Sequence, residues 1–303
     1  MGAGRRLTRR QLLAWTAGGA AAVVAAGAGV LELVDHDVLP GHALLDQIDG
    51  ACTVPGTTLR FSPTGPTVSG QFTSRARRRT VDYVLAYPPG HGPGSHLPLV
   101  VALHAYGASY ANPLAGMSLA QGAALHVGGR PLPPMAFVSA DGGNGYWNPH
   151  PGDDPMAMVV DELVPMCRAR GLGQDRVGIV GVSMGGYGAL LLGERYPAVF
   201  DAVAAVSPAV WTSYGQARAA NAGAYASAAD FAADDVVTHA DRLRGRPVRV
   251  ASGDQDPFHP GVVALAQALP PGAVVVFGKG CHDGGFFTEQ EPPSLAFLAD
   301  HLT

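Results

Sequence analysis

The sequence has few charged residues and almost no lysine. Asp, Glu, Lys and Arg make up 15% of the 303 residues, the formal net charge is −4, and Lys279 is the single lysine. A nucleic-acid-binding protein needs an excess of positive charge to neutralise phosphates. A basic run at residues 75–79 is short and isolated, as is usual for a solvated surface. The composition therefore argues against a nucleic-acid partner.

Cysteine is equally scarce. The three cysteines are too few for a disulfide scaffold, and no Cys/His cluster has metal-ligand spacing. The acidic loop at residues 150–154 has the composition of a turn, so we predict no metal and no cofactor. One bridge remains possible if the chain is exported to an oxidising compartment. The pair to consider is Cys52 with Cys281, whereas Cys167 falls in a helical run.

One long apolar run is present, at the N-terminus. A twin-arginine pattern, Thr8-Arg-Arg-Gln-Leu-Leu13, precedes a small-residue apolar run from Ala14 to Val34. The run has nearly the ~20 residues that span a bilayer, so a retained anchor is the alternative to a signal peptide. Ala26-Gly-Ala28 offers a cleavage site. We predict that residues 1–34 are a twin-arginine signal peptide for export to the cell envelope or medium, with membrane contact only through this segment if uncleaved.

The rest of the chain has the size of one domain, about 270 residues. Residues 35–74 form a loop-rich lead-in, in which Phe61, Val68 and Phe72 suggest an added edge strand. Over residues 75–303, strand-like apolar runs alternate with helical ones. This alternation predicts an α/β fold with a mostly parallel central sheet and helices on both faces. The helices are expected at residues 156–170, 184–195, 229–243, 260–269 and 292–302.

Glycine is abundant, with 41 residues, and its arrangement around Ser183 is the most informative feature. An apolar run ends at Gly181-Val-Ser-Met-Gly185, and a helix-forming run follows. A strand that turns sharply into a helix strains the central residue and excludes bulky neighbours. The Ser183 hydroxyl would then lie at the carboxyl edge of the sheet, where the helix dipole favours developing negative charge. The pattern predicts a nucleophilic serine.

A serine nucleophile needs a base that a carboxylate orients. Two later strand-like runs are followed by Asp254 and Asp256 and then by His282, in the order Ser, Asp, His typical of an α/β-hydrolase fold. Both aspartates are candidates, although Asp256 precedes a proline and could be a turn former. His282 lies in a glycine-rich loop that permits close approach. Its neighbour Asp283 is interpreted as structural.

A fourth group of residues would bind the oxyanion. The strand-like run 97–103 leads into His104-Ala-Tyr-Gly107. Hydrolases of this fold take one oxyanion donor from such a turn and the other from the residue after the nucleophile. We assign these backbone N–H donors to Tyr106 and Met184. His104 is expected to brace the turn.

These motifs together resemble the putative-esterase family of α/β-hydrolases, which includes esterase D-like enzymes, feruloyl esterase domains and mycolyltransferases. The resemblance covers about residues 75–303 and is carried by His104-Ala-Tyr-Gly107, Asp141-Gly-Gly-Asn-Gly-Tyr-Trp147, Asp161-Glu-Leu-Val-Pro165, Gly181-Val-Ser-Met-Gly-Gly-Tyr-Gly188, Ser207-Pro208, Gly253-Asp-Gln-Asp256 and Gly280-Cys-His282. By position it implies Ser183 as nucleophile, Asp256 as acid and His282 as base. Ala105 departs from the usual glycine, which bears on the geometry of the oxyanion turn.

The resemblance implies an exported serine esterase that forms an acyl-enzyme on a small-molecule or carbohydrate-linked ester. Acyl transfer to a cell-envelope carbohydrate would use the same residues. A non-catalytic envelope protein and a cytoplasmic thioester hydrolase are further alternatives, which the intact triad and the signal segment respectively disfavour. Tyr146 and Trp147 are candidates for substrate contact, although they can equally fill the pocket wall. Residues 209–235 are expected to cap the site.

Overall fold

A computed structural model describes residues 52–54 and 56–303 of the chain. The predicted signal peptide and the first part of the lead-in lie outside the described residues. Within the described part, no helix is both long enough and apolar enough to cross a membrane.

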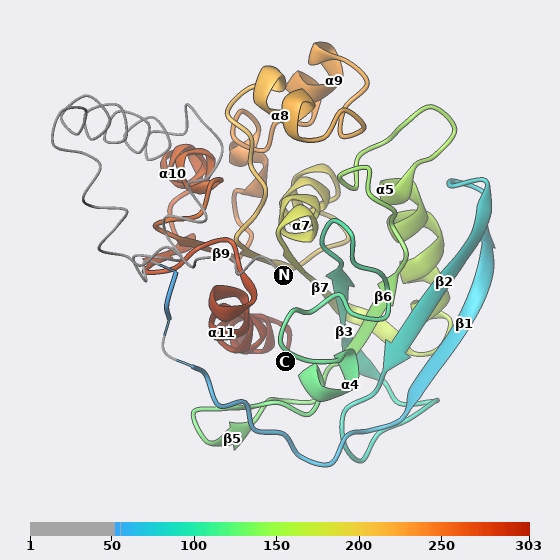
Figure 1. Ribbon diagram of the computed structural model, residues 1–303. Coiled ribbons are helices and arrows are strands. Elements are labelled where there is room, and N and C mark those ends of the chain that lie inside the picture. Colours follow the sequence, from blue (N-terminus) through green and yellow to red (C-terminus); the bar gives the residue numbers. More distant parts are fainter. Residues whose placement is uncertain (1–51, 55) are drawn as a thin grey trace, which may run out of the picture. The chain divides into compact units, whose positions relative to one another are not determined.

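The centre of the described unit is an eight-stranded sheet with the order β1-β2-β6-β3-β7-β8-β9-β10 (Figure 1). Its strands are β1 (Thr67–Ser74), β2 (Arg79–Ala86), β3 (Leu97–Leu103), β6 (Ala136–Ala140), β7 (Leu172–Val182), β8 (Ala202–Val206), β9 (Val248–Gly253) and β10 (Val274–Gly278). β2 is antiparallel to both neighbours, and the other strand pairs of this sheet are parallel. The predicted mostly parallel sheet is therefore confirmed, and β1 is the added edge strand. β4 (His126–Val127) and β5 (Arg130–Pro131) form a separate hairpin.

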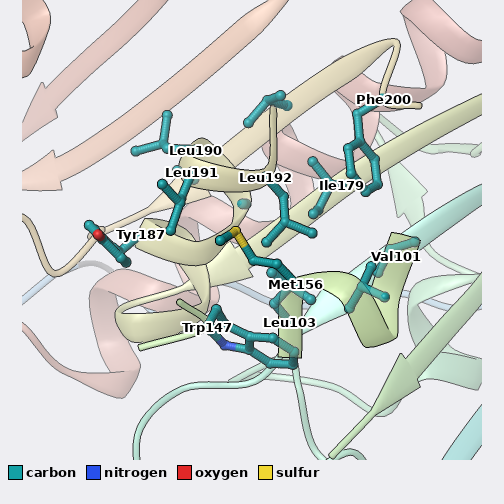
Figure 2. Packing of buried hydrophobic residues seen from close by; sticks show 14 of the residues in the cluster. Val101, Leu103, Trp147, Met156, Ile179, Tyr187, Leu190, Leu191, Leu192 and Phe200 are labelled. Carbon is teal, nitrogen blue, oxygen red and sulfur yellow. The ribbon is translucent and has the colours of Figure 1, made fainter. Parts of the chain in front are cut away.

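Helices cover both faces of the sheet, as the alternation along β3 shows. Leu99, Val101 and Leu103 belong to one apolar cluster, which includes leucines of helix α7 (Met184–Arg195). Val100 and Ala102 belong to a second cluster, which includes leucines of α11 (Gly284–Leu302). Successive side chains of a strand point to opposite faces. The sheet is thus buried between two helical layers, and Figure 2 shows part of the α7 side.

Two of the expected helices match closely: α7 has the predicted bounds, and α10 (His259–Ala268) differs by one residue at each end. The run expected at 156–170 is a helix of three parts, namely α5 (Pro155–Ala157), the π-helical turn η1 (Met158–Leu163) and α6 (Val164–Arg168). Pro165 has no N–H for a regular helical bond, and the N–H of Val164 donates to Val159 five residues back. This wider turn accommodates the proline.

Two helix predictions were wrong in extent. The run expected at 229–243 divides into α9 (Ala228–Ala233) and the 3₁₀ helix η2 (Ala240–Leu243). The Asp235 carboxylate accepts hydrogen bonds from the Val237 N–H and the Thr238 hydroxyl, which competes with helix formation. The helix expected from residue 292 begins earlier, at Gly284, because Asp283 accepts from the Phe286 N–H and caps it.

Three short helices complete the described part: α4 (Leu119–Gly122), α8 (Tyr214–Ala220) and α9. The last two fall within the segment expected to cap the site and lie together (Figure 1).

A disulfide joins the two cysteines that the sequence singled out, Cys52 and Cys281, across a separation of 229 residues. Val54 packs against Gly280 and Gly285 on either side of the second cysteine. Cys167 is free and buried. The start of the described chain is therefore tied covalently to the loop that carries His282.

The helix that follows Ser183 ends in a buried carboxyl group. Glu194 on α7 is 3% exposed, and neither carboxyl oxygen has a hydrogen-bond partner among the described residues. Burial raises the pKa of Glu194 from 4.5 to about 9. The folded protein therefore holds one more proton than the unfolded chain between these two values. The free energy of unfolding contributed by this group falls as pH rises through that window.

We predict that Glu194→Gln flattens the pH dependence of stability, because the amide does not titrate. Between about pH 5 and about pH 8, the free energy of unfolding of the wild type should fall by roughly 1–3 kcal/mol more than that of the variant. Denaturant unfolding at both pH values measures the difference. Asp161→Asn, at an exposed position, is the control and should follow the wild type. Parallel pH curves for wild type and Glu194→Gln would contradict the prediction.

Candidate active site

Ser183 lies at the junction between β7 and α7, in a strained turn. Its backbone angles are φ 56° and ψ −120°, a region that side chains other than glycine rarely adopt. A Cβ atom at Gly181 would collide with the Gly185 backbone, and one at Gly185 would collide with the Leu103 carbonyl. Both flanking glycines are thus required by close approach of backbone to backbone, as the motif predicted.

Three side chains meet beside this turn. His282 Nε2 lies 2.8 Å from Ser183 Oγ, and His282 Nδ1 lies 2.8 Å from Asp256 Oδ2. The second oxygen of Asp256 accepts from the Phe258 N–H at 2.8 Å. The Asp256 side chain is fully buried, whereas that of His282 is 21% exposed. An ionised Asp256 accepts from Nδ1–H, which leaves the Nε2 lone pair to accept from the serine hydroxyl.

Asp254, the competing acid, has a different position. It is exposed, and its carboxylate accepts from the Gly280 N–H at 3.1 Å. Its own N–H donates to the Gly278 carbonyl at 2.8 Å, and the N–H of Gln255 donates to the Gly280 carbonyl at 2.9 Å. Asp254 therefore fastens the backbone of the histidine loop to the acid loop. Asp256 is the carboxylate that contacts the imidazole.

The predicted oxyanion donors are backbone groups at two adjoining turns. Met184 is the first residue of α7, where an N–H has no partner within the helix. The Tyr106 N–H has no hydrogen-bond acceptor among residues 52–54 and 56–303. Alanine is tolerated at position 105 because the left-handed conformation in this turn falls on Gly107, with φ 73°.

His104 braces this turn, as expected. It is fully buried, and its Nε2 accepts from the Gly142 N–H at 3.0 Å. The proton therefore resides on Nδ1, which lies 2.9 Å from the Ala105 carbonyl and donates to it. Trp147 Nε1 donates to the His104 carbonyl at 3.2 Å. The imidazole thus links the oxyanion turn to the loop that follows β6.

The two aromatic residues proposed for substrate contact are both in the interior. Trp147 is 0% exposed and belongs to the same apolar cluster as Leu103 and Met156 (Figure 2). Tyr146 is 4% exposed and packs against Tyr187 with ring centroids 5.6 Å apart. Burial raises the pKa of Tyr146 to about 12, so the phenol is neutral. This burial corrects the expectation for Trp147 in particular, whose ring fills the core and offers no surface to a substrate.

Two phenylalanine rings beside His282 were missed from the sequence. Phe258 and Phe287 each lie 5.0 Å from the His282 ring, centroid to centroid. Trp211 lies 4.6 Å from Phe258 and comes from the predicted cap segment. A usable signal existed for these two phenylalanines, because Phe258 follows Asp256 by two residues and Phe287 follows His282 by five. Together these rings form an apolar surround for the imidazole.

The cap segment also contacts the loop after β6. Asn221, at the end of α8, donates to the Asn144 carbonyl at 3.3 Å. The side chain of Asn144 in turn accepts from the Gly107 N–H at 2.8 Å. These contacts connect the cap segment, the loop after β6 and the oxyanion turn.

The acidic loop considered for a metal is otherwise engaged. His150 contacts the Gly145 carbonyl, Asp153 pairs with Arg77 and Arg79, and Asp154 caps α5. In the part of the chain that the structure describes, one group has ligand atoms close enough for a metal, namely Cys52, Cys281 and Asp283. Its two sulfurs form the disulfide, so neither is a free thiolate.

Comparison with known proteins agrees with this geometry. A family model described as "Putative esterase" matches residues 76–261. The fold is similar to that of a ferulic acid esterase, with 20% identity, a TM-score of 0.63, and coverage of 80% of this chain and 100% of that one. For an S-formylglutathione hydrolase from Agrobacterium tumefaciens, the identity is 16%, the TM-score 0.61, and the coverage 82% and 100%.

A third similar structure is MPT51 of Mycobacterium tuberculosis, with 17% identity, a TM-score of 0.56, and coverage of 82% of this chain and 100% of that one. No curated protein matches the sequence. At these identities the solved structures establish the α/β-hydrolase fold, whereas the family model covers more than half of the chain. The chain therefore belongs to the Putative esterase family.

Proposed function

We propose that the protein is a serine esterase that acts through an acyl-enzyme on Ser183. The observation that carries the proposal is the continuous hydrogen-bond chain from Ser183 through His282 to the buried carboxylate of Asp256. A structural role alone does not require a serine with positive φ that points its hydroxyl at a buried His–Asp pair. This chain also argues against a non-catalytic envelope protein.

In the proposed reaction, His282 Nε2 takes the proton of Ser183 as Oγ attacks the ester carbonyl. The oxyanion accepts hydrogen bonds from the N–H groups of Tyr106 and Met184, each of which contributes ~3 kcal/mol to lowering the barrier. Asp256 stabilises the imidazolium, which then gives its proton to the departing alcohol. Water, activated by the same imidazole, attacks the acyl-enzyme and releases the acid. No step requires a cofactor.

The proposed substrates are small-molecule or carbohydrate-linked carboxylic esters. The rings of Trp211, Phe258 and Phe287 form an apolar surface around His282. This surface favours a substrate with an apolar group next to the scissile bond, because aromatic rings offer few hydrogen-bond partners to a polar group. Transfer of the acyl group to a cell-envelope carbohydrate would differ only in the hydroxyl that attacks the acyl-enzyme. An assay with p-nitrophenyl esters, with and without an added carbohydrate acceptor, distinguishes free acid from acylated sugar.

We also propose export by the twin-arginine route. The proposal rests on the arginine pair and apolar run within residues 1–34. The Cys52–Cys281 bridge supports it, because structural disulfides persist in oxidising compartments outside the cytoplasm. The same argument disfavours a cytoplasmic thioester hydrolase.

Ser183→Ala should abolish activity while leaving the fold intact, since the alanine methyl occupies the space of the hydroxymethyl group without its nucleophile. We expect kcat on p-nitrophenyl acetate to fall by at least about 1,000-fold, and labelling by a fluorophosphonate probe to disappear. Ser69→Ala, at an exposed position of the edge strand β1, is the control. Labelling of Ser183→Ala at the wild-type level would exclude Ser183 as the nucleophile.

Asp256→Asn and Asp254→Asn should have very different effects. The first removes the charge that orients His282 and stabilises its protonated form, so kcat should fall by about 1,000- to 10,000-fold. The second changes a backbone-fastening contact, and we expect a loss below about 10-fold. Steady-state kinetics of both variants, each checked for thermal midpoint, provide the test. The opposite ranking would assign the orienting role to Asp254.

The paired substitution Arg9→Lys with Arg10→Lys should keep the protein in the cytoplasm, because the export receptor reads the two arginines and not their charge. Cell fractionation with an immunoblot measures the distribution. Arg5→Lys with Arg6→Lys, just upstream of the pattern, is the matched control and should be exported normally. Normal export of the Arg9/Arg10 variant would show that another secretory route or an anchor is used.

A further inference from the structure

The oxyanion turn begins a longer loop, residues 104–118, which connects β3 to α4. Its first end is fastened by the Gly107 N–H, which donates to Asn144. Beyond that point the loop makes internal turns, such as Ala108 to Ala105 and Asn112 to Ser109. Among the described residues, a single side chain outside the loop accepts hydrogen bonds from the backbone of residues 108–117.

That side chain is Glu291, on the third turn of α11. It is 0% exposed, and its two carboxylate oxygens accept from consecutive backbone N–H groups, those of Ala115 at 2.5 Å and Gly116 at 3.0 Å. Gly116 also lies against Thr288, one turn earlier on the same helix: a Cβ atom there would be 2.7 Å from the threonine methyl. Only glycine allows the loop to approach α11 this closely.

Burial of the Glu291 carboxyl group costs desolvation free energy. No cationic side chain pairs with it within residues 56–303, and burial raises its pKa to about 7 despite the two N–H donors. An apolar residue would fill the same space without that desolvation cost. The carboxylate offsets this cost by accepting two charge-assisted hydrogen bonds from the backbone of one loop.

The helix that carries Glu291 also contacts the proposed catalytic base, His282. α11 begins two residues after His282, and Phe287 in its first turn packs against the imidazole with ring centroids 5.0 Å apart. One helix therefore contacts the base near its start and the far end of the oxyanion loop about two turns later. This arrangement couples two parts of the site that are far apart in the sequence.

We propose that Glu291 is a positioning residue: by holding the Ala115 and Gly116 N–H groups, it fixes loop 104–118 against α11 and keeps the Tyr106 N–H directed at the oxyanion. This inference rests on the proposed esterase function. Glu291 does not contact the reacting atoms, and its effect is transmitted through the loop. Loss of the anchor should therefore weaken transition-state binding more than substrate binding.

The test compares Glu291→Gln with Glu289→Gln, a control on the same helix whose side chain is half-buried and makes no hydrogen bond to the loop. For Glu291→Gln we expect kcat on p-nitrophenyl acetate to fall by about 10- to 100-fold with KM changed less than about 3-fold. Active-site titration with a fluorophosphonate corrects for the folded fraction. Hydrogen exchange should accelerate across residues 105–118 and not elsewhere.

A second variant addresses the same anchor without altering the buried carboxyl. Gly116→Ala pushes the loop away from Thr288 and should reproduce the fall in kcat and the faster exchange, which keeps the test decisive if Glu291→Gln does not fold. Unchanged kcat in a folded variant with faster loop exchange would overturn the positioning role. Unchanged exchange would overturn the anchor itself. Absence of esterase activity and labelling in the wild type would instead reject the proposed function, and exchange would still report on the anchor.

Discussion

The close approach of the Gly185 backbone to the Leu103 carbonyl is the constraint on which the site depends. It brings the start of α7 against the end of β3, so Ser183, the proposed nucleophile, adjoins the turn proposed to bind the oxyanion. The strain at Ser183 is held by two further contacts: its N–H donates to Val206 at 2.9 Å, and its carbonyl accepts from Ala209 at 3.0 Å. A strained backbone conformation persists in a stable fold when the surrounding structure holds it through several contacts.

Three of the buried carboxyl groups differ in their hydrogen-bond partners. Asp256 has an imidazole and a backbone N–H as hydrogen-bond partners. Glu291 has two N–H donors and a pKa raised to about 7. Glu194 has no partner in the described chain, and its pKa of about 9 keeps it neutral. Glu291, which has two N–H donors, thus has a lower pKa than Glu194, which has none.

Local signals predicted the fold and the residues at the centre of the site, whereas contacts between distant segments did not follow from the sequence. The bounds of α7 follow from the glycines and apolar run around Ser183, and the order of acid and base follows from the succession of strands. The run 229–243 was misread because a single side chain, Asp235, stops the helix. The burial of Trp147 requires glycine at positions 142 and 188, where a Cβ atom would collide with its side chain. Glu291 contacts Gly116, which lies 175 residues away in the sequence. Neither has a periodic signature.

The bridge between Cys52 and Cys281 places a redox-sensitive bond one residue before His282. Recombinant protein made in a reducing cytoplasm would carry two thiols there, and the covalent tie between residue 52 and the histidine loop would be lost, while the packing of Val54 against Gly280 and Gly285 would remain. A preparation could then be soluble and correctly folded over most of its length while its base is less firmly held. The oxidation state of one cysteine pair is thus a measure of sample quality for any kinetic comparison of this enzyme.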